Sequence, residues 1–264
     1  MMVLILYIII LAFIFESMDS MAGMGFGTAL SPLLFLFGYE PLQVVPVILI
    51  SEAITGFIDT FFDHEFKNVE YSFRPLNDAT RIGLIMAFFG CLAIIFSVFL
   101  GYLAIKFSAL IIKTYVAILV LIMGFFGIIR LKLKNVQVSK TRMKMLIGFS
   151  ALAGFNKGIG GGGYGPVITL GQIYSGVYEK SATAIVSFSE SIVSIAGIFT
   201  FFLISFSGVD IDLVLLPSIF TGGFIAALVA PYLVRVLPNK IWKIFIPIYA
   251  IGIGILCILK LYVF

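Results

Sequence analysis

Long apolar stretches alternate with short polar breaks along nearly the whole chain. Two of these stretches, Ile82 to Ile105 and Ile111 to Ile129, together contain a single charged residue. A bilayer core about 30 Å thick is crossed by roughly 20 apolar residues in a helix. Because the strands of membrane barrels alternate apolar and polar residues, unbroken stretches favour helices. The pattern predicts an all-α integral membrane protein.

Charged or turn-forming breaks divide the chain into ten candidate segments. They cover residues 2–24, 26–37, 42–62, 80–105, 110–130, 143–156, 163–175, 181–206, 212–235 and 241–263. The second, sixth and seventh are only 12 to 14 residues long, which is typical of re-entrant or broken helices rather than full spans. We therefore expect about eight membrane segments.

The composition excludes a soluble protein. Of the 264 residues, 61% are hydrophobic and 11% are charged, which is about half the charged share of soluble domains. Ten apolar segments leave no room for a soluble domain. The net charge of +4 reports membrane orientation first, and we expect no nucleic-acid partner.

Residue types that enzymes use are scarce. His64 is the only histidine, which excludes His-based triads and multi-His metal sites. The run from Gly158 to Gly163 satisfies a GxGxxG pattern, but it follows no strand and lacks the Gly-Lys-Ser/Thr of a P-loop. We expect no enzyme activity, cofactor or metal centre, so that any transport is driven by a gradient.

Short motifs recur in the same order in the two parts of the chain. The stretch Gly27 to Pro32 matches Gly161 to Pro166, and Ser51-Glu52 matches Ser189-Glu190. Internal repeats of this kind are common in secondary transporters. We predict two related membrane units at residues 1–131 and 143–264, joined by a basic cytoplasmic linker at 132–142.

Loop charges predict the orientation of the two units. The basic linker is expected inside, and loop 207–212, with two aspartates and no basic residue, is expected outside. If each short glycine-rich pair is a hairpin that returns to its starting side, each unit has three spans plus a hairpin, and the second unit is inverted. This arrangement places Lys106 and Lys113 outside, against the rule. If the hairpin elements are true crossings, the repeats are parallel.

The stretch from Gly148 to Pro166 is the most informative part of the sequence. Its glycines oppose a continuous helix, because each costs about 1 kcal/mol relative to alanine in a helix interior. Unwound backbone at membrane depth has to be buried in protein or line a cavity. A half-helix beginning near Gly163 would point free N–H groups and a positive dipole end into that cavity, which favours an anion.

Candidate anion-binding residues lie in and around the two glycine-rich breaks. Lys157 would add a positive charge, unless it only extends to the membrane interface, and Asn156 would bind a substrate oxygen or cap the broken helix. The predicted binding set is Thr28, Ser31, Ser51, Asn156, Lys157, Gly161, Gly162, Gly163 and Ser189.

Acidic residues within apolar segments are candidates for proton coupling. Glu52 and Glu190 occupy equivalent positions of the two units, and a carboxyl group shielded from water can exchange protons near neutral pH. Asp19, beside the first break, is the third candidate, and Glu16 and Asp59 also lie in or near apolar segments. The alternative is a structural glutamate, either neutral or paired with Lys157.

Four features together identify a family resemblance. They are the glycine-rich run from Gly154 to Pro166, its weaker counterpart from Gly23 to Pro32, the loop Asn68-Val69-Glu70-Tyr71 and the basic linker. With these features the chain resembles, over essentially its whole length, the TauE/SafE family of sulfite and organosulfonate exporters. The resemblance implies two repeats, about eight membrane segments, a plasma-membrane location, and transport of sulfur-containing anions coupled to an ion gradient.

The sequence therefore predicts a proton-coupled exporter of small sulfur-containing anions that works in a lipid bilayer and is compatible with a homodimer. Two other hypotheses stay open. One is a cation or metal permease with Glu52 and Glu190 as ligands, and the other is a membrane scaffold that transports nothing.

Overall fold

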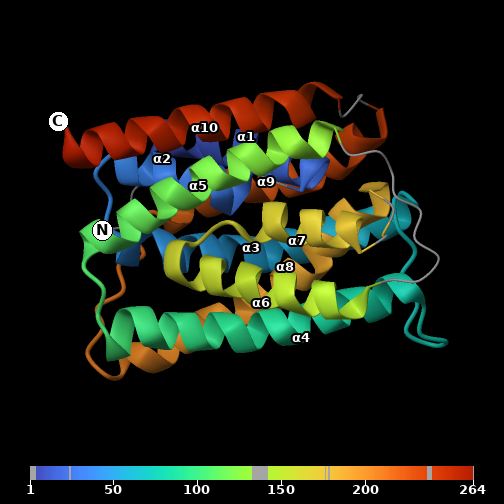
Figure 1. Cartoon of the computed structure of the whole chain (residues 1–264), viewed down its shortest axis with the longest axis horizontal. Helices are drawn as coiled ribbons and strands as arrows, with labels where there is room; N and C mark the ends of the chain where they lie inside the picture. The colour runs from blue at the N-terminus through green and yellow to red at the C-terminus, as the bar shows by residue number, and fades with distance from the viewer. Residues whose placement is uncertain are drawn as a thin grey trace.

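The computed structural model describes residues 4–23, 25–132, 142–175, 177, 179–236 and 240–263, so most of the predicted linker lies outside the described residues. The helices lie side by side along one axis (Figure 1). Those before the linker are α1 (Leu6–Ala22), η1 (Phe26–Leu30), α2 (Ser31–Leu36), α3 (Pro41–Glu65), α4 (Asp78–Val98), η2 (Phe99–Ala104) and α5 (Ala109–Lys132). Those after it are α6 (Met143–Gly160), α7 (Tyr164–Tyr174), α8 (Glu179–Ser205), α9 (Leu216–Val236) and α10 (Lys240–Tyr262).

Five helical stretches among the described residues are long and apolar enough to cross a membrane. They are Pro41–Glu65, Asp78–Ala104, Ala109–Ile129, Ala182–Ser205 and Leu216–Leu233. Two shorter apolar helices cover Phe26–Leu36 and Pro247–Tyr262. The prediction of an all-α, multi-pass membrane protein is confirmed, whereas the number of eight segments stays a prediction.

Helix contacts follow a two-fold pattern between the parts before and after the linker. Helix α3 packs on α8 and α5 packs on α10, while α1 packs on α9 as α6 packs on α4. Exchanging each of α1–α5 with its counterpart in α6–α10 leaves the α3–α8 and α5–α10 contacts unchanged. The same exchange turns the α1–α9 contact into the α6–α4 contact. Helix α10 ends at the end of the bundle where α5 begins (Figure 1). These contacts and the opposite directions of α5 and α10 are those expected of an inverted repeat. The duplication itself stays a prediction.

The predicted break between Gly148 and Pro166, with a half-helix beginning near Gly163, is confirmed, but the break is short. Helix α6 continues through Gly154 and Gly158 to Gly160, and only residues 161–163 leave the helix. A Cβ added at Gly154 would collide with the carbonyl of Gly90 on α4, and one at Gly158 would collide with the Ser97 hydroxyl. Helices in lipid gain from close packing of small residues, so these glycines serve the contact between α4 and α6.

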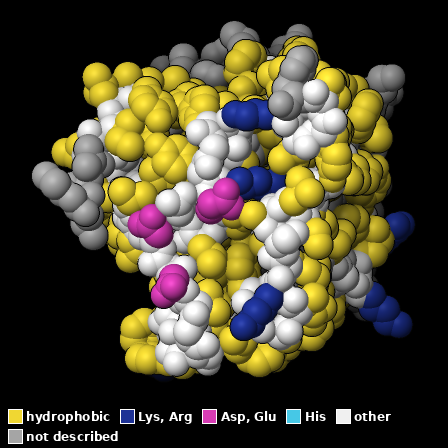
Figure 2. Space-filling model, turned by 90° about the vertical axis from the view of Figure 1, so that its left-hand side faces the viewer, with side chains coloured by type: hydrophobic (Ala, Val, Ile, Leu, Met, Phe, Trp, Pro, Cys, Tyr) yellow, Lys and Arg dark blue, Asp and Glu magenta, His cyan; other side chains and the backbone are white. Residues whose placement is uncertain are grey.

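The bundle end that carries the chain termini has a mixed charge. Acidic and basic side chains gather there within a hydrophobic rim (Figure 2). Lys113 forms an ion pair of 2.8 Å with Glu40, the residue before α3. The Gln43 side chain and the Val214 N–H donate hydrogen bonds to Asp212 and hold the pKa of its carboxyl below the usual value.

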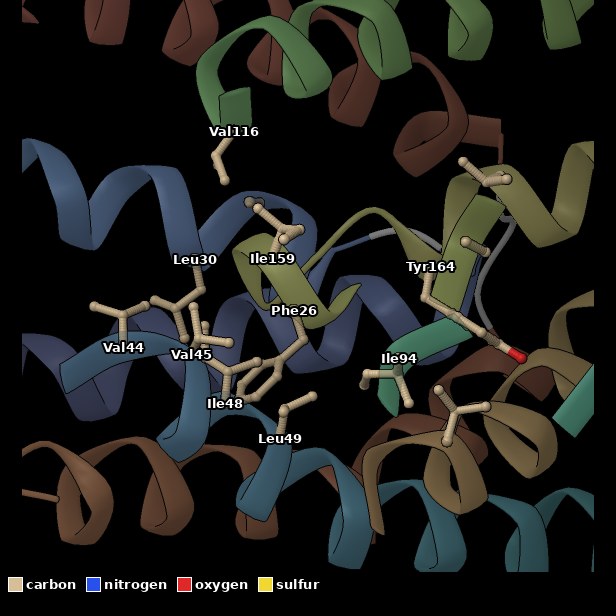
Figure 3. Packing of buried hydrophobic residues seen from close by; sticks show 14 of the residues in the cluster. Phe26, Leu30, Val44, Val45, Ile48, Leu49, Ile94, Val116, Ile159 and Tyr164 are labelled. Carbon is tan, nitrogen blue, oxygen red and sulfur yellow. The ribbon is translucent and has the colours of Figure 1, made fainter. Parts of the chain in front are cut away.

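Hydrophobic side chains surround the first break. Phe26 and Leu30 lie against Val45 and Ile48 of α3, close to Ile159 at the end of α6 (Figure 3). All five are at most 2% exposed. The backbone that leaves regular α-helix is therefore enclosed by protein, as a bilayer requires.

Candidate functional site

The two glycine-rich breaks touch each other through backbone atoms. A Cβ added at Gly27 would collide with the carbonyl of Gly161, and one at Gly162 would collide with the carbonyl of Gly27. Gly161 and Gly163 have φ angles of 74° and 83°, a left-handed conformation that glycine adopts at little cost. The chain can therefore turn from α6 into α7 directly against the first break.

Two predicted hydroxyl residues hold this crossing together. Thr28 Oγ1 accepts a hydrogen bond of 3.0 Å from the Gly163 N–H. Ser31 Oγ donates one of 2.5 Å to the Gly160 carbonyl. Both bonds join the first break to the second, so both hydroxyls are engaged between the two predicted units.

Three backbone N–H groups at the breaks already have partners, and two of them belong to the predicted binding residues Gly161 and Gly163. The Gly27 N–H donates to Glu52 Oε1 at 3.2 Å, and the Gly161 N–H donates to the Lys157 carbonyl at 2.8 Å. The third is the Gly163 N–H, which Thr28 occupies. Buried backbone groups without partners are costly, and here the protein itself supplies the acceptors.

Lys157 lies in the last turn of α6 and is fully buried. Its Nζ donates to Glu190 Oε1 at 2.7 Å and also to Glu52 Oε2, so that one ammonium joins α6 to both α3 and α8. It lies 5.7 Å from the centre of the Tyr164 ring, within cation–π range. The structure thus excludes a lysine that extends to the interface, and it shows the pairing that the structural alternative expected.

The remaining predicted polar residues differ in what they can offer a substrate. The Tyr115 hydroxyl donates to Asn156 Oδ1, while Asn156 Nδ2 is buried without a partner among the described residues. Ser51 Oγ is likewise buried and unpaired there. Ser189 donates to the Val186 carbonyl of its own helix at 3.0 Å. Asn156 and Ser51 therefore keep hydrogen-bonding capacity, whereas the Ser189 proton is in use.

A small polar cavity lies beside the Lys157 ion pairs. The space inside it that is open to water-sized molecules is ≈ 10 Å³, about the room for one water. Its lining comes from α1, α3 and α8 and consists of Glu16, Asp19, Glu52, Thr55, Gly56, Asp59, Ser187 and Glu190. A larger pocket of ≈ 360 Å³ is mostly apolar, lies between α3, α8 and loop 206–215, and contains none of the predicted site residues.

Sequence reasoning missed Tyr115 and Tyr164, and it noted Glu16 and Asp59 only as acids in or near apolar segments. A signal for Asp59 was present, since Glu52 and Asp59 are seven residues apart and share one face of a helix. No local pattern connects the two tyrosines to Lys157 or Asn156. Those contacts arise only when distant helices pack.

Comparisons with known proteins agree with the architecture. The model of the sulfite exporter TauE/SafE family matches residues 8–257. The probable membrane transporter protein YtnM of Bacillus subtilis (strain 168) is 27% identical over 229 residues, which are 83% of this chain and 71% of that protein. No solved structure matches the chain. The family match includes both breaks, Lys157 and both glutamates, and the chain therefore belongs to the TauE/SafE sulfite exporter family of multi-pass membrane transporters.

Proposed function

We propose that this protein is a proton-coupled carrier that exports small sulfur-containing anions, such as sulfite or an organosulfonate, across the cell membrane. The family match supports this class of cargo. The observation that carries the proposal is the buried Lys157 ammonium, which Glu52 and Glu190 share beside the crossing of the two breaks.

The ion pairs suggest how protons and the anion are coupled. While both carboxylates are ionised, they occupy the ammonium and repel an anion. With both ionised, the cluster of Lys157, Glu52 and Glu190 carries one net negative charge. One proton makes the cluster neutral, and a proton on each glutamate leaves the buried ammonium in need of a new counter-charge. A sulfite or sulfonate group supplies it, with Asn156 Nδ2 and Ser51 Oγ as further hydrogen-bond donors. Proton and anion therefore move together, and export follows the outward gradient of the anion.

Alternating access requires that the site opens to each side in turn. Lys157 is fully buried, so the described arrangement is closed around the site. The two-fold contacts between α1–α5 and α6–α10 support a rocking of one unit against the other, as in transporters built from inverted repeats. In this proposal the Lys157 ion pairs and the crossing of the two breaks stay near the centre of the movement.

Flux measurements in proteoliposomes test the proposal. Sulfite, sulfoacetate and taurine are compared with a panel of divalent cations, with and without a pH gradient. We expect anion flux that depends on the gradient and disappears in Lys157→Ala, whereas Lys144→Ala, which alters an exposed lysine of the same helix, stays active. Cation flux without anion flux would overturn the proposal.

The cation permease is the second candidate, because five carboxyl groups line the small cavity. The two candidates differ in which variant loses binding. For a cation carrier, Glu52→Gln or Glu190→Gln abolishes cation binding. For the anion carrier, the same variants keep anion binding and lose the dependence of flux on pH.

A further inference from the structure

Carboxyl groups follow one face of α3 from the centre of the bundle to its end. Glu52, Asp59 and Asp63 are spaced by seven and four residues, with Thr55 between the first two, so they form a stripe along the helix. The three acids are 4%, 3% and 7% exposed. Their burial is unusual, since carboxylates within membrane helices are costly and generally functional.

The cavity beside this stripe holds more acids than the protein can neutralise with bases. Five carboxyl groups line it, and Lys157 is shared by two of them, Glu52 and Glu190. Glu16, Asp19 and Asp59 form no ion pair with a lysine or arginine among the described residues. Helix α9 also packs on α1 and α3, and its stretch from 216 to 233 contains no charged residue. Buried charges need compensation. For these acids, bound protons supply it by neutralising the carboxylates.

Three oxygen atoms of the cavity lining, on Glu16, Thr55 and Asp59, are buried without a hydrogen-bond partner among the described residues. Asp59 Oδ2 accepts a hydrogen bond of 2.5 Å from Ser20 Oγ, whereas Asp59 Oδ1 is buried without a hydrogen-bond partner among the described residues. An unsatisfied carboxylate oxygen in such a place is expensive. A proton on Oδ1, or a water in the adjacent space, removes this cost. The geometry at Asp59 therefore indicates a place where a proton resides.

Acidic side chains lead from the cavity to the end of α3. Glu16, Asp19 and Asp59 line the same cavity as Glu52 and Glu190, and Asp63 lies one helical turn beyond Asp59 on the same face of α3. Asp63 Oδ1 accepts a hydrogen bond of 2.8 Å from Asn68 Nδ2 in the loop that follows α3. The next two residues of the helix, 64 and 65, are exposed. The stripe thus extends from the Lys157 ion pairs to the surface at one end of the bundle.

We infer that Glu16, Asp19, Asp59 and Asp63 form the route by which protons reach Glu52 and Glu190 from the bundle end that carries loop 66–77. At each step a proton leaves one carboxyl oxygen and binds a water or the next carboxylate, so every group regains its starting state after the proton has passed. The inference rests on the proposed function, because it assigns the entry of the coupling proton. The anion site of the proposed function lies at Lys157, which is not part of this proton route.

Asp59→Asn separates the route from the anion site. Two rates are measured in proteoliposomes: net sulfite flux driven by a pH gradient, and exchange of labelled for unlabelled sulfite at equal pH on both sides. We expect the driven flux to fall by about tenfold or more, with exchange changed by less than about twofold. Asp59→Glu should restore the driven flux. Glu70→Gln, an exposed acid in the loop at the same bundle end, should leave both rates unchanged.

Three results would overturn the inference. They are an unchanged driven flux in Asp59→Asn, an equal loss of flux and exchange, and a driven flux that requires a sodium gradient instead of a pH gradient. If the wild-type protein exchanges no sulfite, the proposed function fails, and a second readout still tests the route. A hydrophobic carbodiimide, which reacts with protonated carboxyl groups in apolar surroundings, should modify Glu16 or Asp59 in the wild-type protein. No reaction at either residue would overturn the route independently of the cargo.

Discussion

Helices α3 and α8 pack against each other and both contribute a Ser-Glu pair, yet beyond that pair they differ. At three, seven and eleven residues after Glu52, α3 carries Thr55, Asp59 and Asp63. At the same distances after Glu190, α8 carries Val193, Gly197 and Phe201. Phe201 is 1% exposed and packs against Tyr102 with ring centres 5.0 Å apart.

In the proposed mechanism, this difference divides the tasks between two helices that occupy equivalent positions of the predicted repeat. Helix α3 combines its glutamate with a polar face, while α8 combines its glutamate with an apolar face that seals the bundle. A polar route on both helices would connect the two sides of a membrane and dissipate the proton gradient. One polar and one apolar face avoid this leak.

Loss of the ammonium that joins the two helices should have the largest effect. Removal of one partner from a buried ion pair costs about 3–5 kcal/mol, and Lys157→Met leaves both glutamates unpaired. We expect a large drop in thermal stability in detergent and no anion flux. Lys157→Met combined with Glu52→Gln and Glu190→Gln should regain most of the stability without flux. A triple variant as unstable as the single one would show that the loss has another origin.

Replacing each glutamate in turn measures how unequal the two helices are. Glu52 accepts the Gly27 N–H in addition to Lys157, so Glu52→Leu also leaves that buried N–H unpaired. We expect Glu52→Leu to reduce the free energy of unfolding by about 1–3 kcal/mol more than Glu190→Leu does. Unfolding of the two variants under identical detergent conditions checks this difference. Equal losses would contradict the additional role of Glu52.

Thr55→Val makes α3 more like α8 at one position. The substitution removes a hydroxyl from the lining of the cavity and changes the side-chain volume little. We expect the free energy of unfolding to change by less than about 1.5 kcal/mol and the pH-driven flux to slow a few-fold. Val193→Thr, the reverse change on α8, should not accelerate that flux. An acceleration would argue against a sealed face on α8.

Charges at the helix ends should matter least. Lys113 pairs with Glu40 at the start of α3, but the Glu40 side chain is 54% exposed. Exposed pairs contribute about 0–1 kcal/mol, so Lys113→Gln should change stability by no more than this. Raising the salt concentration should reduce the difference further. A larger loss that resists salt would mean that the end of α3 is as important as its buried face.

Helix positions followed well from the sequence, because lipid imposes a simple rule on apolar length. The predicted segment 42–62 became Pro41–Glu65, and the predicted segment 110–130 became Ala109–Lys132. The end of α6 did not follow, because the effect of Gly154 and Gly158 depends on Gly90 and Ser97 of another helix. Propensity alone disfavours glycine in a helix, but close packing reversed that preference here.

The candidate site could be predicted only in part. Glu52, Lys157 and Glu190 were identified because charges within apolar segments are conspicuous. That one ammonium joins both glutamates did not follow, since Lys157 and Glu52 are 105 positions apart in the chain. The cavity formed by α1, α3 and α8 likewise depends on how three helices meet, which local periodicity does not encode.

The contact between Gly27 and Gly162 has a mechanical consequence. Two backbones meet there with no side chain between them, so no change of rotamer can absorb a displacement. Sliding one break along the other would drive carbonyl groups into each other, whereas a small rotation about the contact keeps the atoms apart. We therefore expect the crossing to act as a pivot that resists sliding more than tilting.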